Sequence, residues 1–233
     1  MAMEYCGGGT LYDLVQSRCG KPMSEKWIAY FCRETLKGLN SLHKHRIVHR
    51  DVKGVNIMLT DKAKVKLVDF GLCAQLDHKP DKSKDCKTLP SKCIDCWLNS
   101  DGEYDFKGDI WSLGVTAVEL ADGNPPLPYI PESAAIDKIL TNSSNLPWSK
   151  NFQSFLEECL RYNPDHRASA KELLRHSFLQ GLPPDKEIRQ EIMDYLQKIQ
   201  RKKVDKGAAQ AEQLAKAANP ALKNTQLKRR KQR

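Results

Sequence analysis

The segment His49-Arg50-Asp51-Val52-Lys53-Gly54-Val55-Asn56 decides the fold, and a second short motif, Asp69-Phe70-Gly71, follows it along the chain. The first has the form H-R-D-x-x-x-x-N and the second is D-F-G, and together they supply a carboxylate, a lysine, an amide and a second carboxylate. Carboxylate and amide oxygens are ligands that suit Mg²⁺. The two motifs therefore indicate chemistry on a magnesium-bound phosphate group.

Each of the four polar side chains has a predicted role in such chemistry. Asp51 can accept or orient the proton of an attacking hydroxyl, and Lys53 can place a positive charge near a moving phosphoryl group. Asn56 and Asp69 are the predicted magnesium ligands. A lone D-F-G would be weak evidence, but two motifs in this order rarely arise by chance.

The sequence around the motifs predicts a helical domain with a few short strands. Apolar runs at residues 47–48, 57–59 and 65–68 read as strands that flank the motifs. Ser24 is the predicted cap of a helix that ends near His45. Residues 106–120 are apolar on all sides and predict a buried helix. Further helices are expected at residues 132–140, 151–160, 169–177 and 187–203.

The composition is that of a globular protein with a basic C-terminal region. The formal net charge is +9, and Lys and Arg are concentrated after Lys198. We expect a body at residues 1–182, a helical extension at 183–203 and a basic, disordered tail at 204–233. Such a tail can touch acidic surfaces, although the body contains no nucleic-acid-binding motif.

The sequence also bears on location and redox state. No apolar run approaches the roughly 20 residues of a membrane-spanning helix, and the N-terminus does not resemble a signal peptide. The 8 cysteines therefore read as free thiols in a reducing compartment, with the cytoplasm as the expected location. Cys93 and Cys96 form a C-x-x-C near Cys86 and His78, which leaves a zinc site open as a weaker alternative.

Beyond the two motifs, several stretches resemble a known family. They are Trp27–Tyr30, Val65–Gly71, Ala74–Asp77, Tyr104–Lys107, Asp109–Gly114 and Phe152–Phe155. From Met3 to Lys203 the chain resembles the C-terminal lobe of a sterile-20-like serine/threonine kinase of the germinal-centre kinase group. The likeness is to the branch of Nck-interacting and Misshapen-like kinases, with the kinase part of class III myosins as the alternative.

This resemblance implies a fold class and an activity. The fold would be mainly α, a protein-kinase-like C-terminal lobe with a short β-hairpin region around the catalytic loop and without the N-terminal β lobe. The activity would be ATP- and magnesium-dependent phosphoryl transfer to Ser or Thr of protein substrates in signal transduction. In this resemblance, a lysine at position 53 is typical of serine/threonine kinases rather than tyrosine kinases.

The resemblance also implies roles for individual residues. Met3 would be the gatekeeper, and the backbone of the hinge, including Glu4 and Cys6, would bind adenine. The structural and regulatory residues would be His49 and Arg50 of the first motif, Thr88, Asp95, Asp109 and Arg167. Among these, Arg50 would receive an activation-loop phosphate, for which Ser83, Thr88 and Ser91 are candidate sites. Asp109 would hold the catalytic-loop backbone, and Asp95 would pair with Arg167.

The chain departs from the family pattern in two places. It lacks a Gly-rich loop, a strand lysine and a helix glutamate to grip the phosphates, because Gly7–Gly9 has the context of a turn. Residues 88–95 also differ from the expected G-T-P-x-W-M-A-P-E. We therefore expect little or no kinase activity from this chain alone. The alternative is a pseudokinase-like scaffold that engages kinase partners or adaptors without catalysis.

Overall fold

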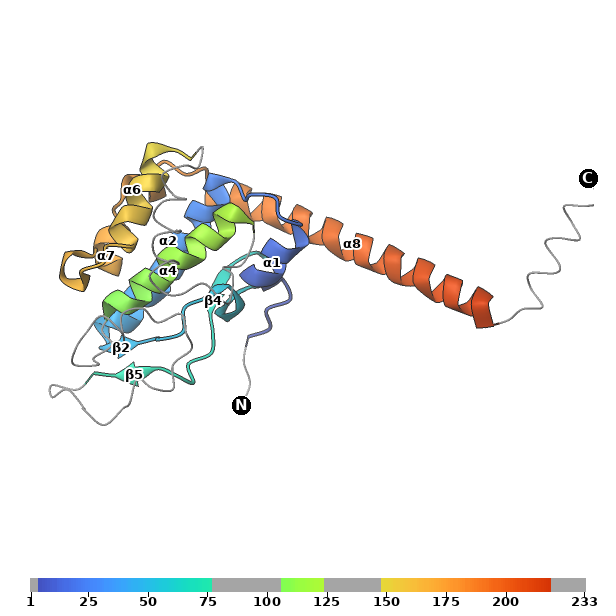
Figure 1. The fold of residues 1–233 in the computed structure, drawn as a ribbon, viewed down its shortest axis with the longest axis horizontal. Coiled ribbons are helices and arrows are strands. Elements are labelled where there is room, and N and C mark those ends of the chain that lie inside the picture. The colour runs from blue at the N-terminus through green and yellow to red at the C-terminus, as the bar shows by residue number, and fades with distance from the viewer. Residues whose placement is uncertain (1–3, 77–105, 124–147, 219–233) are drawn as a thin grey trace, which may run out of the picture. The chain divides into compact units, whose positions relative to one another are not determined.

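The computed structural model describes residues 4–76, 106–123 and 148–218 of the chain (Figure 1). The chain divides into two compact units, Met1–Glu191 and Ile192–Arg233. The helix expected at residues 132–140 lies outside the described residues. The helices are α1 (Leu11–Ser17), α2 (Glu25–Lys44), α4 (Phe106–Asp122), α6 (Lys150–Cys159), α7 (Ala170–Leu173) and α8 (Asp185–Ala218), with the 3₁₀ helices η1 (Gly54–Asn56), η3 (Pro164–His166) and η4 (Ser177–Leu179).

Helices α2 and α4 run side by side and form the centre of the first unit (Figure 1). Most residues of α4 are buried, as its all-round apolar sequence predicts, and Ile110 and Trp111 are almost inaccessible to solvent. Helix α6 packs on α4, and α7 packs on α2. The core is therefore helical, and the prediction of a mainly α fold is confirmed.

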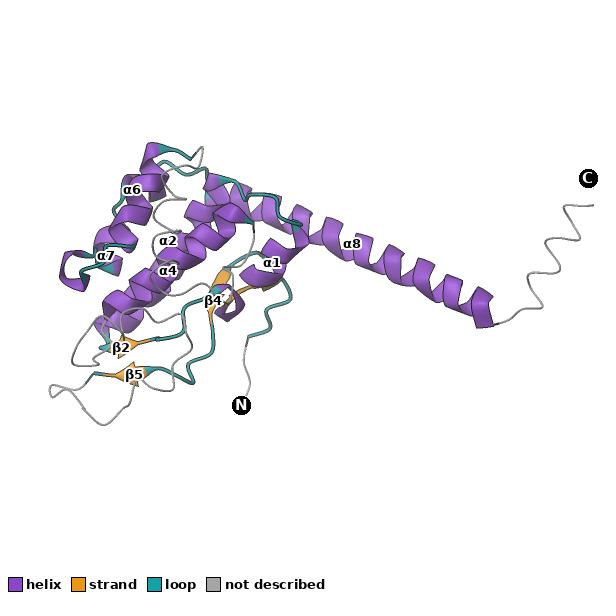
Figure 2. Ribbon diagram, in the orientation of Figure 1, coloured by secondary structure: helices purple, strands orange, loops and turns teal. Residues whose placement is uncertain are grey.

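In the described residues, five short strands lie beside this core (Figure 2). They are β1 (Gly9–Thr10), β2 (Ile47–Val48), β3 (Ile57–Leu59), β4 (Val65–Leu67) and β5 (Ala74–Gln75). The antiparallel order β1-β3-β4 pairs Thr10 with Met58 and Ile57 with Leu67, while β2 pairs with β5. The three strands predicted from apolar runs are present: β2 and β3 flank the first motif, and the second motif follows β4 and precedes β5.

The structure differs from the predicted elements at three points. Strands β1 and β5 and helix α1 were not predicted, although Thr10 and Asp13 form a capping box at the start of α1. The helix expected at residues 169–177 ends after one turn, at Leu173, and the chain continues into η4. Helix α8 continues to Ala218, beyond the helix expected at residues 187–203.

Candidate active site

The first motif is fixed to the helical core through one buried carboxylate. Asp109, in the first turn of α4, is fully buried. Its two oxygens accept hydrogen bonds from the backbone N–H of His49 at 2.9 Å and of Arg50 at 2.8 Å. The Nε2 atom of His43 also lies 2.8 Å from Asp109 Oδ2. The loop between β2 and η1 is therefore tied to α4 at its backbone, where the resemblance placed Asp109.

The predicted catalytic carboxylate lies at the centre of a small polar cluster. Lys53 Nζ lies 2.8 Å from Asp51 Oδ2, and the Asn56 side-chain amide donates to the same oxygen at 2.7 Å. Asn56 also donates to the Asp51 carbonyl at 2.9 Å. These contacts hold the Asp51 carboxylate in one orientation and bring three of the four predicted catalytic residues together.

Hydrogen bonds to the backbone of Val68 hold the second motif beside the first. Val68 donates its N–H to the Asn56 carbonyl at 2.9 Å, and its own carbonyl lies 3.1 Å from His49 Nε2. The rings of His49 and Phe70 meet edge to face with centroids 5.3 Å apart. Asp69, which follows Val68 directly, is therefore held next to the Asn56 loop, and its Oδ1 accepts from Gly71 N at 3.3 Å.

Two residues of the motifs adopt an unusual backbone conformation. Arg50 has φ +68° and Asp69 has φ +63°, in the left-handed region that residues with a Cβ occupy at a cost. Both are held there by neighbours, Arg50 through its N–H bond to Asp109 and Asp69 through the contacts of Val68. Such strain, stored at two polar residues of one site, is typical of functional loops.

The segment predicted as the hinge lies against the β1-β3-β4 sheet. Gly8 donates to the Leu59 carbonyl at 2.9 Å, and a Cβ on Gly8 would lie 2.8 Å from that of Leu59, so this close approach requires glycine. Glu4 pairs with Lys66 of β4 at 2.8 Å, and the hydrogen bond from Lys66 lowers the pKa of Glu4. Cys6 is partly buried, and Met3 lies outside the described residues.

Arg167 is buried and anchored by backbone carbonyls. Its guanidinium donates to the carbonyls of Lys107 at 2.8 Å and of Arg161 at 3.0 Å, and it lies 4.9 Å from the centre of the Trp111 ring. The predicted partner Asp95 lies outside the described residues, as does Thr88, so the pairing of Asp95 with Arg167 stays a prediction.

The sequence also left open a zinc site formed by cysteines and a histidine. The C-x-x-C with its neighbours Cys86 and His78, and the candidate phosphorylation sites, all lie at residues 77–105, outside the described ranges. In residues 4–76, 106–123 and 148–218, no cluster of three His, Cys, Asp or Glu side chains is suited to a metal ion. Cys73, close to the site, is a free thiol whose pKa is raised to about 11, chiefly by burial.

The donor atoms of the motifs fit a magnesium ion bound to phosphate. The Asn56 amide nitrogen is used by Asp51, which leaves its carbonyl oxygen as the metal-binding atom, and Asp69 adds a carboxylate. Both are hard oxygen ligands on adjacent loops.

The sequence did not identify His43 as part of this site, because its contact with Asp109 spans 66 positions.

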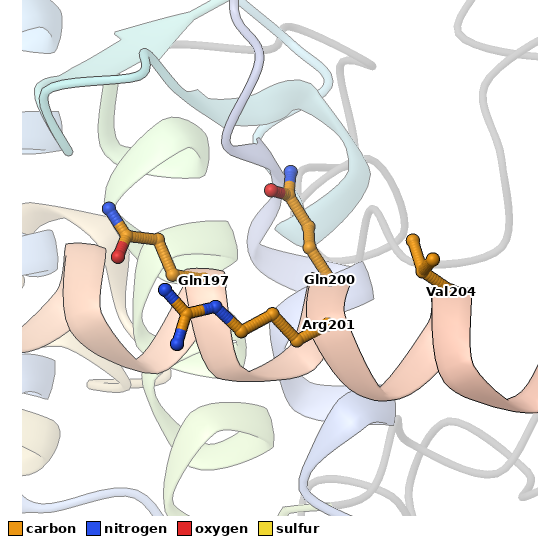
Figure 3. A pocket seen from close by; sticks show the side chains of 4 residues that line it. All are labelled: Gln197, Gln200, Arg201 and Val204. Carbon is orange, nitrogen blue, oxygen red and sulfur yellow. The ribbon is translucent and has the colours of Figure 1, made fainter.

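A shallow surface hollow occurs elsewhere, on the second unit (Figure 3). It is lined by Gln197, Gln200, Arg201 and Val204, which all come from α8. None of these is a predicted site residue, and side chains from one helix do not enclose a ligand.

In the part of the chain that the structure describes, no helix has the length and apolar character to cross a bilayer.

A carboxylate held by lysine and asparagine, next to a second carboxylate on the following strand loop, is the arrangement of a phosphotransferase site of the protein kinase class. Comparison with known proteins agrees with this geometry. Residues 1–179 match the protein kinase domain family, and the chain belongs to that family.

The similar proteins include kinases of the branch that the sequence resembles and a class III myosin, the alternative likeness. Misshapen-like kinase 1 from rat is 38% identical over 214 residues, which is 88% of this chain and 16% of that protein. Serine/threonine-protein kinase mig-15 from Caenorhabditis elegans is 39% identical over 214 residues, 88% of this chain and 20% of that protein. Myosin-IIIa from mouse is 38% identical over 208 residues, 84% of this chain and 13% of that protein. The chain thus spans a fifth or less of the length of these relatives, and its likeness to the germinal-centre kinase group is confirmed.

Proposed function

We propose that this chain carries the catalytic loop and metal-binding residues of a serine/threonine protein kinase, as the C-terminal lobe of the domain. The observation that carries the proposal is the cluster in which Lys53 and Asn56 both contact Asp51 Oδ2. Membership of the kinase family and the names of relatives such as serine/threonine-protein kinase mig-15 support it. The reaction would transfer phosphate from ATP to a Ser or Thr hydroxyl of a protein in a signalling pathway.

In this proposal each residue has a distinct task. Asp51 orients the attacking hydroxyl and accepts its proton, while Lys53 places a positive charge beside the phosphoryl group in flight. Mg²⁺, when bound to ATP, neutralises the phosphate oxygens, and Asn56 and Asp69 are the residues that would hold it. The backbone of the hinge, including Glu4 and Cys6, would bind adenine.

A scaffold function is the second candidate, and one stretch of the sequence favours it. Residues 88–95 depart from the family pattern. A helical domain of this kind can engage kinase partners or adaptors without catalysis. It would keep the Asp109 contacts, which stabilise the fold, but would not need Asp69 as a metal ligand.

Nucleotide binding by the purified chain separates the two candidates. We expect titration calorimetry to detect weak, magnesium-dependent binding of ATP, and expect Asp69→Asn to weaken it at least about tenfold by removing one ligand charge. Asp165→Asn is the matched control, because Asp165 is exposed in η3, away from both motifs in the sequence. Equal ATP binding by the parent chain and by Asp69→Asn would contradict the kinase proposal and favour the scaffold.

A further inference from the structure

Positive charge is concentrated in the second unit, which includes most of α8. Residues 192–233 carry 12 Lys and Arg and 3 Asp and Glu, whereas the first unit is balanced. Three of these cations lie in the described part of α8 and are exposed: Lys198, Arg201 and Lys202. None of the three forms an ion pair with another described residue, in contrast to Lys26 of the first unit. These side chains are therefore available to an external anion.

The three basic residues form one continuous strip on the helix surface. Residues three and four positions apart are neighbours on a helix, so Lys198 lies next to both Arg201 and Lys202. Like charges at these spacings oppose helix formation. The exposed Gln197 and Gln200 lie on the same stretch of α8 and add hydrogen-bonding groups (Figure 3). An anion bound along this basic strip would relieve the repulsion and meet both kinds of group.

The same part of α8 has no apolar face for a membrane or a protein groove to bury. The large apolar side chains of α8 are buried or half-buried up to Ile199, and between residues 200 and 213 the only one is Val204, which is 70% exposed. Helices that lie in a membrane surface bury a face rich in Trp, Phe or Leu, and helices that bind protein grooves use regularly spaced apolar anchors. Residues 196–233 also contain no Phe, Trp or Tyr on which single-stranded bases could stack. The pattern favours a partner that is recognised by charge.

A double-helical nucleic acid meets these requirements. Its phosphates form a dense array of negative charge, and binding through them needs neither apolar nor aromatic groups. The major groove of B-DNA admits an α-helix, with phosphates of both strands on its two sides. Residues 192–218 of α8 extend over about 40 Å, slightly more than one turn of a duplex. Lys, Arg and Gln side chains all serve as phosphate contacts.

We propose that the second unit binds double-stranded nucleic acid through its phosphates, with Lys198, Arg201 and Lys202 of α8 in contact with them. This inference does not rest on the proposed function, because none of the three residues belongs to the candidate active site. The binding would be independent of base sequence, since phosphate contacts position a protein without reading the bases. DNA and RNA duplexes share this backbone chemistry, and the test distinguishes them.

Fluorescence anisotropy with the full chain measures the binding. The probes are a labelled DNA duplex of about 30 base pairs and an RNA duplex of the same sequence, each titrated at about 50 and 200 mM salt. We expect a dissociation constant of about 10 μM or below at the lower salt and at least about tenfold weaker binding at the higher salt, because bound phosphates release counterions. Vesicles of equimolar phosphatidylserine and phosphatidylcholine, and poly-glutamate, are then added as competitors.

Two triple variants of equal net charge locate the site. The strip variant replaces the three basic residues of α8: Lys198→Gln, Arg201→Gln and Lys202→Gln. The control variant replaces three exposed lysines of the first unit: Lys21→Gln, Lys62→Gln and Lys171→Gln. Glutamine has nearly the helix propensity of lysine and arginine, and circular dichroism verifies that both variants keep the helix content of the parent chain.

The two variants should differ in both affinity and salt dependence. We expect the strip variant to bind at least about tenfold more weakly at the lower salt. The slope of log K against log salt should also become shallower by about 2–3, since each lost phosphate contact removes about 0.9. The control variant should bind within about twofold of the parent chain, because its substitutions lie outside the second unit.

Each outcome supports or overturns the proposal. Duplex binding that the strip variant loses and the control variant keeps supports it, and the duplex bound more tightly identifies the nucleic acid. No binding of either duplex up to about 100 μM at the lower salt overturns it, as does an equal loss in both variants, which would indicate attraction to total charge. Vesicles or poly-glutamate that displace the duplex at a lower concentration of negative charge would also overturn it, and would assign the basic strip to a lipid surface or an acidic protein.

Discussion

At the scale of single residues, one buried carboxylate determines where the catalytic loop lies. Asp109 accepts two backbone N–H groups through its two oxygens and contacts His43 as well. A buried N–H without an acceptor costs more than a hydrogen bond normally contributes, because the group has lost its water. The loop geometry around Asp51 therefore depends on a residue about 60 positions away.

Replacing Asp109 with asparagine tests this dependence. The introduced amide would retain one acceptor oxygen, so the N–H of either His49 or Arg50 would face an NH₂ group. We expect Asp109→Asn to lower the free energy of unfolding by about 1–3 kcal/mol, measured by urea denaturation. The exposed Asp165→Asn should change it by less than about 0.5 kcal/mol. Equal stability of the two variants would show that the Asp109 contacts do not hold the loop.

A second residue-scale prediction concerns pH. His176 caps η4 by accepting from Phe178 N at 3.2 Å through Nδ1, which requires that nitrogen to be unprotonated. Burial lowers the pKa of His176 from its ordinary value of 6.5. Because the folded state disfavours the proton, its contribution to stability is full above pH 6.5 and is lost as the pH falls from there through the lower folded pKa.

The variant His176→Asn isolates this effect. Asparagine can still accept the Phe178 hydrogen bond but does not titrate, so the loss of stability between about pH 7 and pH 5 should be smaller in His176→Asn than in the parent chain. Unfolding midpoints in urea at the two pH values measure it. If both proteins lose the same stability, other groups account for the acid sensitivity.

At the scale of elements, the sequence predicted those helices whose apolar pattern is decided locally. Most residues of α4 are buried, as is a continuous segment of α2 from Trp27 to Cys32, and both helices were predicted within two residues of their ends. Helix α7 was predicted too long because His176 starts a new cap and turns the chain into η4. The pattern of apolar residues does not reveal this competition between a longer helix and a new cap.

The candidate site could likewise be predicted only in part. Asp51, Lys53 and Asn56 belong to one motif, and their spacing predicts that the three side chains lie close together. The contact of His43 with Asp109, and the packing of Tyr12 on Gly54, join residues far apart in the chain. These contacts depend on the packing of α1, α2 and α4, which no local pattern specifies.

The start of α8 allows a comparison of apolar and ionic contributions within the first unit. Ile188 is 1% exposed, whereas Glu191 forms an exposed ion pair with Lys26 at 2.7 Å and accepts from Trp27 Nε1 at 3.2 Å. We expect Ile188→Ala to cost about 2–4 kcal/mol through lost burial and the cavity left behind. Glu191→Gln should cost at most about 1 kcal/mol, because water screens the pair.

Urea denaturation of both variants at neutral pH measures this difference. The hydrogen bond from Lys26 lowers the pKa of Glu191 from 4.5, so the small ionic contribution is present above that pH and is lost as the pH falls through the folded value. A larger cost for Glu191→Gln than for Ile188→Ala would mean that charge, rather than burial, attaches this helix.

At the scale of the whole molecule, charge and candidate catalysis belong to different parts of the chain. Residues 192–233 carry 12 Lys and Arg and 3 Asp and Glu, a net charge of +9 that equals the formal charge of the entire chain. The first unit, which contains the candidate site, is balanced. Any general attraction to acidic surfaces therefore belongs to the second unit.

The last prediction concerns phosphoryl transfer by the chain as a whole. Asp51, Lys53, Asn56 and Asp69 supply acid–base and metal-binding groups, but the sequence contains no Gly-rich loop or strand lysine to grip the phosphates. Loss of one charged phosphate contact is expected to cost about 2–4 kcal/mol, or roughly 30- to 1000-fold in rate. We therefore expect this chain alone to transfer little or no radiolabelled phosphate from Mg-ATP to a Ser/Thr peptide.

A chimera provides the comparison that this prediction needs. Joining a Gly-rich loop and strand lysine from an active serine/threonine kinase to the start of this chain would supply such phosphate contacts, and we expect a rate at least about 30-fold higher. Asp51→Asn in the chimera should remove the gain, which would place the chemistry in the loop described above. Equal turnover by the chain and the chimera would contradict the prediction, because the residues of this chain would then suffice to hold the phosphates.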